Sequence, residues 1–145
     1  MDKDLIILSL ASGARGPYPL DPIRIMKGAF LVSQLGSPEL KKHFAFKPYN
    51  YGPFDLSVYE TLDQLKKRNL LAEVKEGDSK YPTYSITAEG STALTTVSSG
   101  ANEKELSWLK DISAYVTSRS FEDLLTEIYK RFPTYAEKSV FKKKI

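Results

Sequence analysis

The segment YGPFDLSVYETLDQLKKRNLLAEV, residues 51–74, decides the fold of this chain. Its Gly-Pro pair at 52–53 is typical of a turn, and either Asp55 or Ser57 can accept hydrogen bonds from the free N–H groups that begin a helix. The spacing of the apolar residues predicts a helix from about residue 55 to residue 69. The apolar side of that helix carries Val58, Leu62 and Leu65, with Tyr59 at its edge.

A β-hairpin and a further helix are predicted directly after this helix. Residues 70–74 are mostly apolar and predict a strand, residues 76–79 have the composition of a turn, and residues 81–87 alternate in part and predict the returning strand. Thr87 can cap a short helix over residues 88–97. The centre of the chain is therefore expected to be helix, strand, turn, strand, helix.

Two helices are predicted nearer the N-terminus. Residues 4–12 form a short apolar segment that predicts the first of them. Asp21-Pro22 is a good start for the second, because aspartate can cap a helix and the fixed φ of proline suits the first helical position. The apolar residues that follow cover more than one face, so we expect a largely buried helix that ends at Gly36.

A short helix and an extended segment are expected between Gly36 and the decisive segment. The helix should lie near residues 38–43, where a Ser-Pro-Glu start signal is repeated. Aromatic residues alternate along residues 44–51, which predicts an extended segment that the Gly-Pro pair at 52–53 stops.

The C-terminal third is predicted to be helical. Asn102 and Ser120 each begin a helix with an apolar stripe. A loop at residues 98–101 separates these helices from the preceding ones and is the plausible boundary in the chain. We therefore expect a core over residues 1–97 and a helical extension over residues 98–145, packed together as a single compact unit.

Composition restricts the class of protein. The chain has 145 residues, enough for one domain with its own core. No apolar run approaches the roughly 20 residues that span a bilayer, and the acidic Asp2 and Asp4 precede the first apolar segment, which is the wrong charge for a signal peptide. There are no cysteines, so disulfides and thiolate metal sites are excluded. These features favour a cytoplasmic protein with no membrane partner.

The sequence lacks the usual residue patterns of catalysis. His43 is the only histidine, and nothing local marks a partner for it. There is no Gly-x-Ser-x-Gly nucleophile elbow, no phosphate-binding lysine loop and no Gly-x-Gly-x-x-Gly. We therefore predict a protein that is not an enzyme and that uses no metal ion and no cofactor.

Several motifs resemble known families. PadR-like and MarR-like winged-helix regulators have a wing strand and following helix similar to Tyr84-Ser85-Ile86-Thr87-x-x-Gly90 with Leu94 after it. Small bacterial and phage proteins related to the Panacea antitoxin domain are similar over about residues 20–140, including Tyr51-Gly52-Pro53-Phe54-Asp55 and Tyr129-x-x-Phe132-Pro133-x-Tyr135-Ala136-x-x-Ser139. The resemblance implies a mainly α fold with a small β-hairpin (α+β), in which a winged helix-turn-helix core carries a C-terminal helical extension.

The first function that the resemblance implies is transcriptional regulation by binding double-stranded DNA, as a homodimer on a two-fold site. The helix at 55–69 would enter the major groove, and the hairpin at 70–87 would reach the backbone. Charge weighs against this, because residues 55–90 carry five Lys or Arg and seven Asp or Glu, including Glu60 and Asp63 on the helix itself. The expected DNA-binding residues are Ser57, Thr61, Gln64, Lys67, Arg68, Lys75, Lys80 and Tyr81.

The alternative is an antitoxin-like or adaptor protein that uses the same scaffold to bind another protein, such as a toxin. Large aromatic side chains are frequent in the C-terminal third and can anchor such an interface or a homodimer. The same side chains can instead cover the open side of the core, and both explanations stay open. They are Trp108, Tyr115, Phe121, Tyr129, Phe132 and Tyr135.

Overall fold

A computed structural model describes residues 1–75, 77, 81–97 and 102–140 of the chain. Within these residues the protein is mainly helical and has two small antiparallel sheets of two strands each, so the prediction of a mainly α protein with a small β-hairpin is confirmed. In chain order the elements are α1 (Lys3–Ser12), α2 (Pro22–Leu35), α3 (Pro38–Lys41), β1 (Lys47–Tyr49), β2 (Gly52–Phe54), α4 (Leu56–Lys67), β3 (Leu71–Val74), β4 (Thr83–Ile86), α5 (Ala88–Val97), α6 (Asn102–Thr117), α7 (Phe121–Arg131) and the 3-10 helix η1 (Pro133–Ala136).

Local signals set both ends of α2. Asp21 Oδ1 accepts a hydrogen bond from the Arg24 N–H at 2.9 Å, and Pro22 occupies the first helical position. At the other end the Gly36 N–H donates to the Val32 carbonyl. Between them the helix is buried from Arg24 to Val32, as its apolar residues on several faces predicted.

The start and end of α4 also follow from its sequence. Asp55 caps the helix, and its two carboxylate oxygens accept hydrogen bonds from the N–H groups of Ser57 at 2.9 Å and Ala45 at 2.8 Å. Burial of the Asp55 carboxyl group favours its neutral form, but these hydrogen bonds outweigh that effect and hold its pKa below the ordinary value. The chain leaves the helix through Asn69, whose φ of 59° lies in the left-handed region that asparagine tolerates.

The extended segment expected at residues 44–51 is part of a hairpin. β1 pairs antiparallel with β2, and Tyr49 lies opposite Gly52 in the register. The Gly-Pro pair therefore forms the returning strand, and the prediction that it stops the extended structure was wrong. The physical reason is the φ of 93° at Gly52, which lets the chain reverse at residues 50–51.

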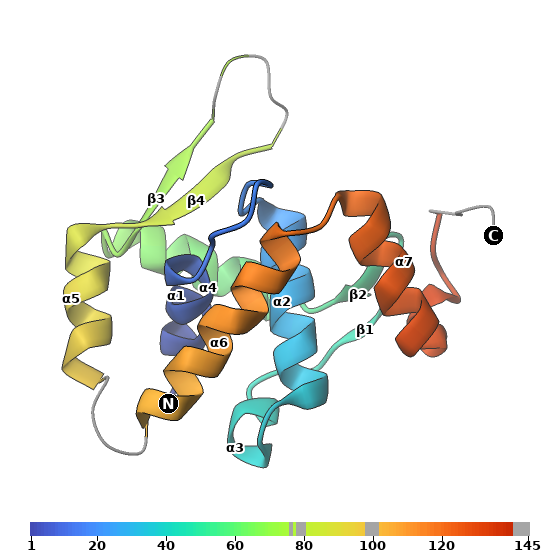
Figure 1. Cartoon of the computed structure of the whole chain (residues 1–145), viewed down its shortest axis with the longest axis horizontal. Coiled ribbons are helices and arrows are strands. Elements are labelled where there is room, and N and C mark those ends of the chain that lie inside the picture. Colours follow the sequence, from blue (N-terminus) through green and yellow to red (C-terminus); the bar gives the residue numbers. More distant parts are fainter. Residues whose placement is uncertain (76, 78–80, 98–101, 141–145) are drawn as a thin grey trace.

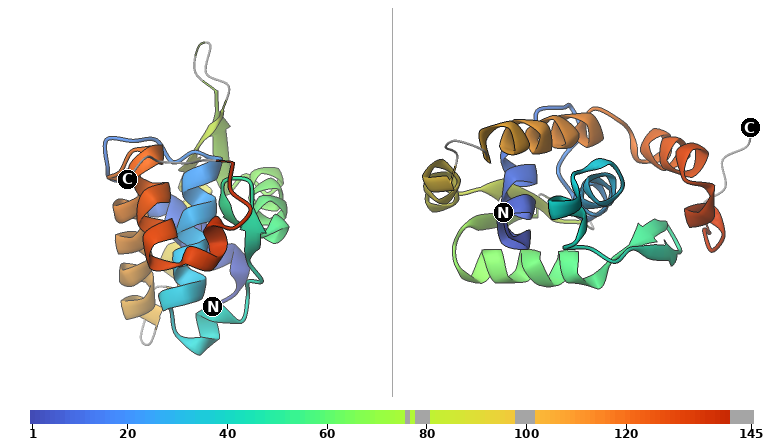
Figure 2. Two further views of the ribbon diagram at one scale, coloured as in Figure 1. Left: turned by 90° about the vertical axis from the view of Figure 1, so that its right-hand side faces the viewer. Right: turned by 90° about the horizontal axis from the view of Figure 1, so that it is seen from below.

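The helices α6, α1 with α2, and α4 form three layers, of which the pair α1 and α2 is the middle one. Figure 2 (right) shows α6 on one side of this pair and α4 on the other. Leu109 of α6, Ile6 of α1 and Leu65 of α4 belong to one buried hydrophobic cluster. The first helix of the C-terminal third is thus packed against the N-terminal helices, while the expected boundary at residues 98–101 lies outside the described residues.

The two hairpins lie at different ends of the molecule. Figure 1 shows β3 and β4 projecting from the body, next to α5, whereas β1 and β2 lie near α7. A second buried cluster fills the space between α2 and α7 and includes Phe30, Leu31, Leu124 and Ile128. The β3–β4 hairpin and the aromatic residues of α7 and η1 therefore lie on different parts of the fold.

Candidate interaction surface on α4 and the β3–β4 hairpin

One long side of α4 is exposed, and the other is buried. Val58, Leu62 and Leu65 are at most 3% exposed and hold the helix on the first cluster, as predicted. The exposed residues recur every three or four positions and so form a stripe along the helix. We call this the α4 stripe: Leu56, Glu60, Asp63, Gln64 and Lys67.

The flank of α4 that faces α1 is partly covered. Thr61 is only 7% exposed, and its hydroxyl donates to the Ser57 carbonyl at 2.8 Å. The Ser57 hydroxyl in turn accepts a hydrogen bond from Lys3 Nζ of α1 at 2.9 Å. The prediction that Thr61 faces outward was therefore wrong, because the start of α1 packs along this flank.

Each cation of the α4 C-terminus is paired with a carboxylate of the chain itself. Lys66 Nζ lies 2.7 Å from Glu73 of β3, and Lys67 Nζ lies 2.9 Å from Asp63. The guanidinium of Arg68 lies 2.9 Å from Asp4 of α1. The hydrogen bond from Lys67 and its charge lower the pKa of Asp63, so that this acid is charged at neutral pH. Lys67 and Arg68, both predicted phosphate contacts, thus each form an ion pair with a neighbouring acid, while their side chains remain 67% and 56% exposed.

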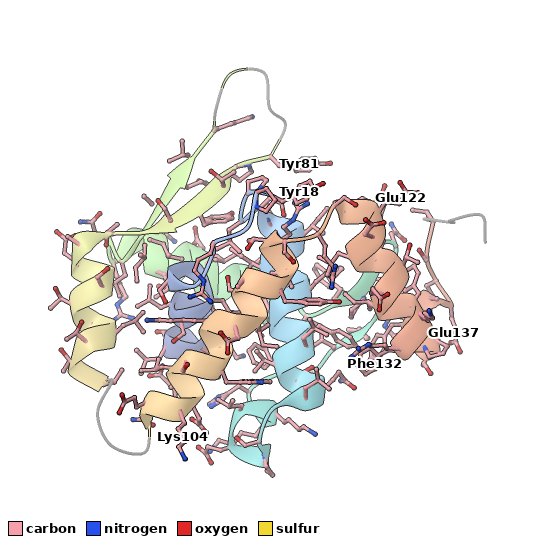
Figure 3. All side chains as sticks on the ribbon, in the orientation of Figure 1. Tyr18, Tyr81, Lys104, Glu122, Phe132 and Glu137 are labelled. Atoms are coloured by element: carbon pink, nitrogen blue, oxygen red, sulfur yellow. The ribbon has the colours of Figure 1, made fainter. Side chains whose placement is uncertain are left out.

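The β3–β4 hairpin carries the remaining predicted DNA contacts. Lys75 and Tyr81 are exposed, and Figure 3 shows Tyr81 at the projecting part of the hairpin. Lys80 lies outside the described residues. At the base of the hairpin, burial and then the neighbouring Glu73 raise the pKa of Tyr84 to about 12, so this phenol stays protonated.

The aromatic residues of the C-terminal third mainly build the protein's own interior. All six are partly buried, and Trp108 packs against the first cluster. The rings of Phe132 and Tyr135 make edge contacts with Phe30 of α2, at centroid distances of 5.1 and 4.7 Å. Figure 3 labels Phe132 on the α7 side of the molecule. Binding of a partner by these six aromatic residues stays a prediction, and it can involve only the parts of the rings that are exposed.

A small apolar cleft of about 180 Å³ lies between α2, α6 and α7. Tyr115 and Phe132 line it together with Ile112 and with Leu35, which is 51% exposed. Two of the six predicted interface residues thus meet at one concave spot of the surface.

Sequence reasoning missed Lys27. This side chain is 4% exposed, although lysine is among the residues least often buried. The signal was present in the sequence, because Lys27 lies within the apolar run of a helix predicted to be buried on several faces. Arg24 was missed in the same way, but it forms an ion pair with Asp21.

Comparison with protein-family models and with curated proteins gives no match for this chain. The resemblance to the Panacea, PadR and MarR groups therefore stays a prediction from the motifs quoted above. Among the described helices, none combines the length and the hydropathy that a membrane crossing requires.

Proposed function

We propose that this chain is a winged helix-turn-helix module that binds another protein through the α4 stripe. The order α2, α3, β1, β2, α4, β3, β4 supports the scaffold, because a helix followed by a hairpin, here α4 with β3 and β4, is the layout expected of such a module. Protein binding is favoured over DNA binding by the charges of α4.

The observation that carries the proposal is the acidic character of the α4 stripe. Glu60 is an exposed acid, and the Asp63–Lys67 pair next to it has no net charge. The stripe therefore has a net negative charge, which phosphate oxygens repel, although Gln64 on it is of a type that DNA-reading helices use. Leu56, which is 58% exposed, adds an apolar contact at the start of the stripe. The partner that fits is a protein with a basic surface bordering an apolar patch, as an antitoxin's toxin partner can offer.

Reversing the charge of the α4 stripe is expected to abolish capture of this partner. The variant is Glu60→Lys with Asp63→Lys, and the matched control is Glu89→Lys with Glu103→Lys, which reverses two exposed acids on α5 and α6. Wild-type and control proteins, immobilised and exposed to extract of the native host, should retain one common protein, identified by mass spectrometry. The stripe variant should lose it, because like charges across an interface are repulsive.

The proposal fails if the stripe variant retains the same proteins as the wild type while its circular dichroism shows a native fold. It also fails if raising the salt concentration leaves capture unchanged, since a complementary-charge interface weakens as ionic strength rises.

DNA binding is the second candidate, favoured by the projecting hairpin with its exposed Lys75 and Tyr81 (Figure 1). On this alternative the hairpin contacts the phosphate backbone, and Gln64 faces the bases from the α4 stripe. Thr61 has no part in it, because its side chain is buried, and the Ser57 hydroxyl is engaged by Lys3.

Fluorescence anisotropy with a random duplex at low salt separates the two candidates. If the protein-binding proposal holds, we expect no change in anisotropy. Salt-sensitive binding would establish DNA binding instead. Lys75→Ala should then weaken the affinity for every duplex alike and reduce the salt dependence by roughly one counterion.

A further inference from the structure

The β1–β2 hairpin covers a cavity of about 250 Å³ against α2. Lys27 lines this cavity. The cavity walls also include Ile23, Met26, Tyr49, Phe54 and Tyr59. We infer that the cavity binds a small monocarboxylate with a planar apolar body, held by an ion pair between its carboxylate and the Lys27 ammonium group.

Lys27 is a buried amine with one hydrogen bond to the described part of the chain. Its Nζ donates to the Pro53 carbonyl at 3.2 Å. None of the ion pairs among the described residues involves it. An ammonium group has three donors, and a buried charge without a counter-ion is costly. A carboxylate in the cavity supplies both an acceptor and the opposite charge.

The other buried cation of α2 shows what a satisfied site looks like. Arg24 lies one turn before Lys27 and is also 4% exposed. Its guanidinium lies 2.6 Å from Asp21, donates to the Arg119 carbonyl at 3.0 Å and lies 4.9 Å from the centre of the Tyr18 ring. The same helix thus carries one cation whose partners belong to the protein and one that faces a cavity.

The walls of the cavity define the chemistry of the ligand. Lys27 is the one charged side chain among the described residues that line it, so a single negative charge is matched and a phosphate dianion is not. The rings of Tyr49 and Phe54 lie 5.0 Å apart, and those of Phe54 and Tyr59 lie 5.6 Å apart. Such a set of rings favours a flat apolar body. Tyr49 is 53% exposed, which places the mouth of the cavity at the hairpin.

Ligand binding at this site is coupled to proton uptake. Burial lowers the pKa of Lys27 to about 7, so at pH 8 most of the free protein carries the neutral amine. A bound carboxylate favours the charged form and therefore draws in a proton. The other titratable side chains that line the cavity are the phenols Tyr49, Tyr51 and Tyr59, and burial, followed by the charge of Asp21, raises the pKa of Tyr59.

Isothermal titration with benzoate and with its neutral analogue benzamide tests the inference. At pH 8 the wild type should bind benzoate about tenfold or more tightly than benzamide, because a charge-assisted hydrogen bond is made with benzoate alone. Titrations in two buffers of different ionisation enthalpy should show uptake of a proton with benzoate. Lys27→Met should remove both the preference and the proton uptake. The control Lys47→Met, which changes an exposed lysine on β1, should keep both.

A second measurement on the wild type is independent of how well the variant folds. Benzoate should slow the reductive methylation of Lys27, followed by mass spectrometry, and leave that of Lys47 unchanged. Equal affinity for benzoate and benzamide, a Lys27→Met protein that keeps the preference, or an unprotected Lys27 would each overturn the inference. So would failure to detect benzoate binding at about 10 mM.

Discussion

Replacing Phe30 with alanine is expected to lower the free energy of unfolding by about 3–5 kcal/mol. Phe30 is fully buried, at 0% exposure. Its ring makes edge contacts with Phe46, Phe132 and Tyr135, at centroid distances of 5.3, 5.1 and 4.7 Å. These three rings come from the segment before β1, from the end of α7 and from η1. The cavity left by the ring therefore weakens the attachment of three segments to α2.

Urea denaturation followed by circular dichroism measures this loss. Tyr49→Ala is the control, because it removes a ring that is 53% exposed, and it should cost less than about 1 kcal/mol. Hydrogen exchange should accelerate in η1 and in the last turn of α7 before it does in α5, which lies at the other end of the molecule (Figure 1). A loss for Phe30→Ala no greater than that for Tyr49→Ala would contradict the packing described here.

Lys27→Met is expected to change how stability depends on pH. The pKa of Lys27 is about 7 in the folded protein, where burial lowers it, against 10.5 as the ordinary value in the unfolded chain. Between these values the unfolded chain binds more protons on this residue, so Lys27 makes the wild type more stable as the pH rises from about 7 to 10.5. At roughly 1.4 kcal/mol for each pKa unit, the gain over this window is about 4–5 kcal/mol.

The measurement is the free energy of unfolding of both proteins in urea across this pH window. Groups other than Lys27 titrate in both proteins, and their contributions cancel in the difference between the two curves. We expect Lys27→Met to be the more stable protein near pH 7 and its advantage to shrink steadily towards pH 10. Parallel curves for the two proteins would show that Lys27 titrates at its ordinary pKa and is hydrated in the folded state.

The parts of the fold that sequence reasoning predicted correctly are those that local chemistry determines. The Asp21-Pro22 start of α2 and the Asp55 cap of α4 each involve atoms within three residues of one another. The buried side of α4, with Val58 and Leu62, follows from the helical period. The winged helix-turn-helix assignment and the function stay predictions, since they do not follow from helix caps and helical periodicity.

Two of the errors concern contacts between segments that are distant in the sequence, and one concerns the backbone conformation of a local turn. Thr61 is polar and was expected to face outward, but the position of α1 beside α4 buries it. The hairpin at β1 and β2 depends on the left-handed conformation of Gly52, and Gly-Pro composition by itself indicates equally well that a strand ends. Lys27 is a candidate site residue because the β1–β2 hairpin lies over it. The helical period of α2 predicts which residues are buried but not which segment covers them.

The hydrogen bond from Lys3 to Ser57 and the ion pair between Asp4 and Arg68 tie the two ends of α4 to the first turn of α1. The first residues of α1 consequently occupy the Ser57 hydroxyl and the Arg68 guanidinium, two polar groups that α4 could otherwise offer to a partner. A purification tag joined to Met1 is therefore attached two residues before Lys3, the first side chain that holds this flank of α4. Removal of residues 1–4 takes away the partners of Ser57 and Arg68. The Arg68 guanidinium is then a positive charge without its carboxylate partner.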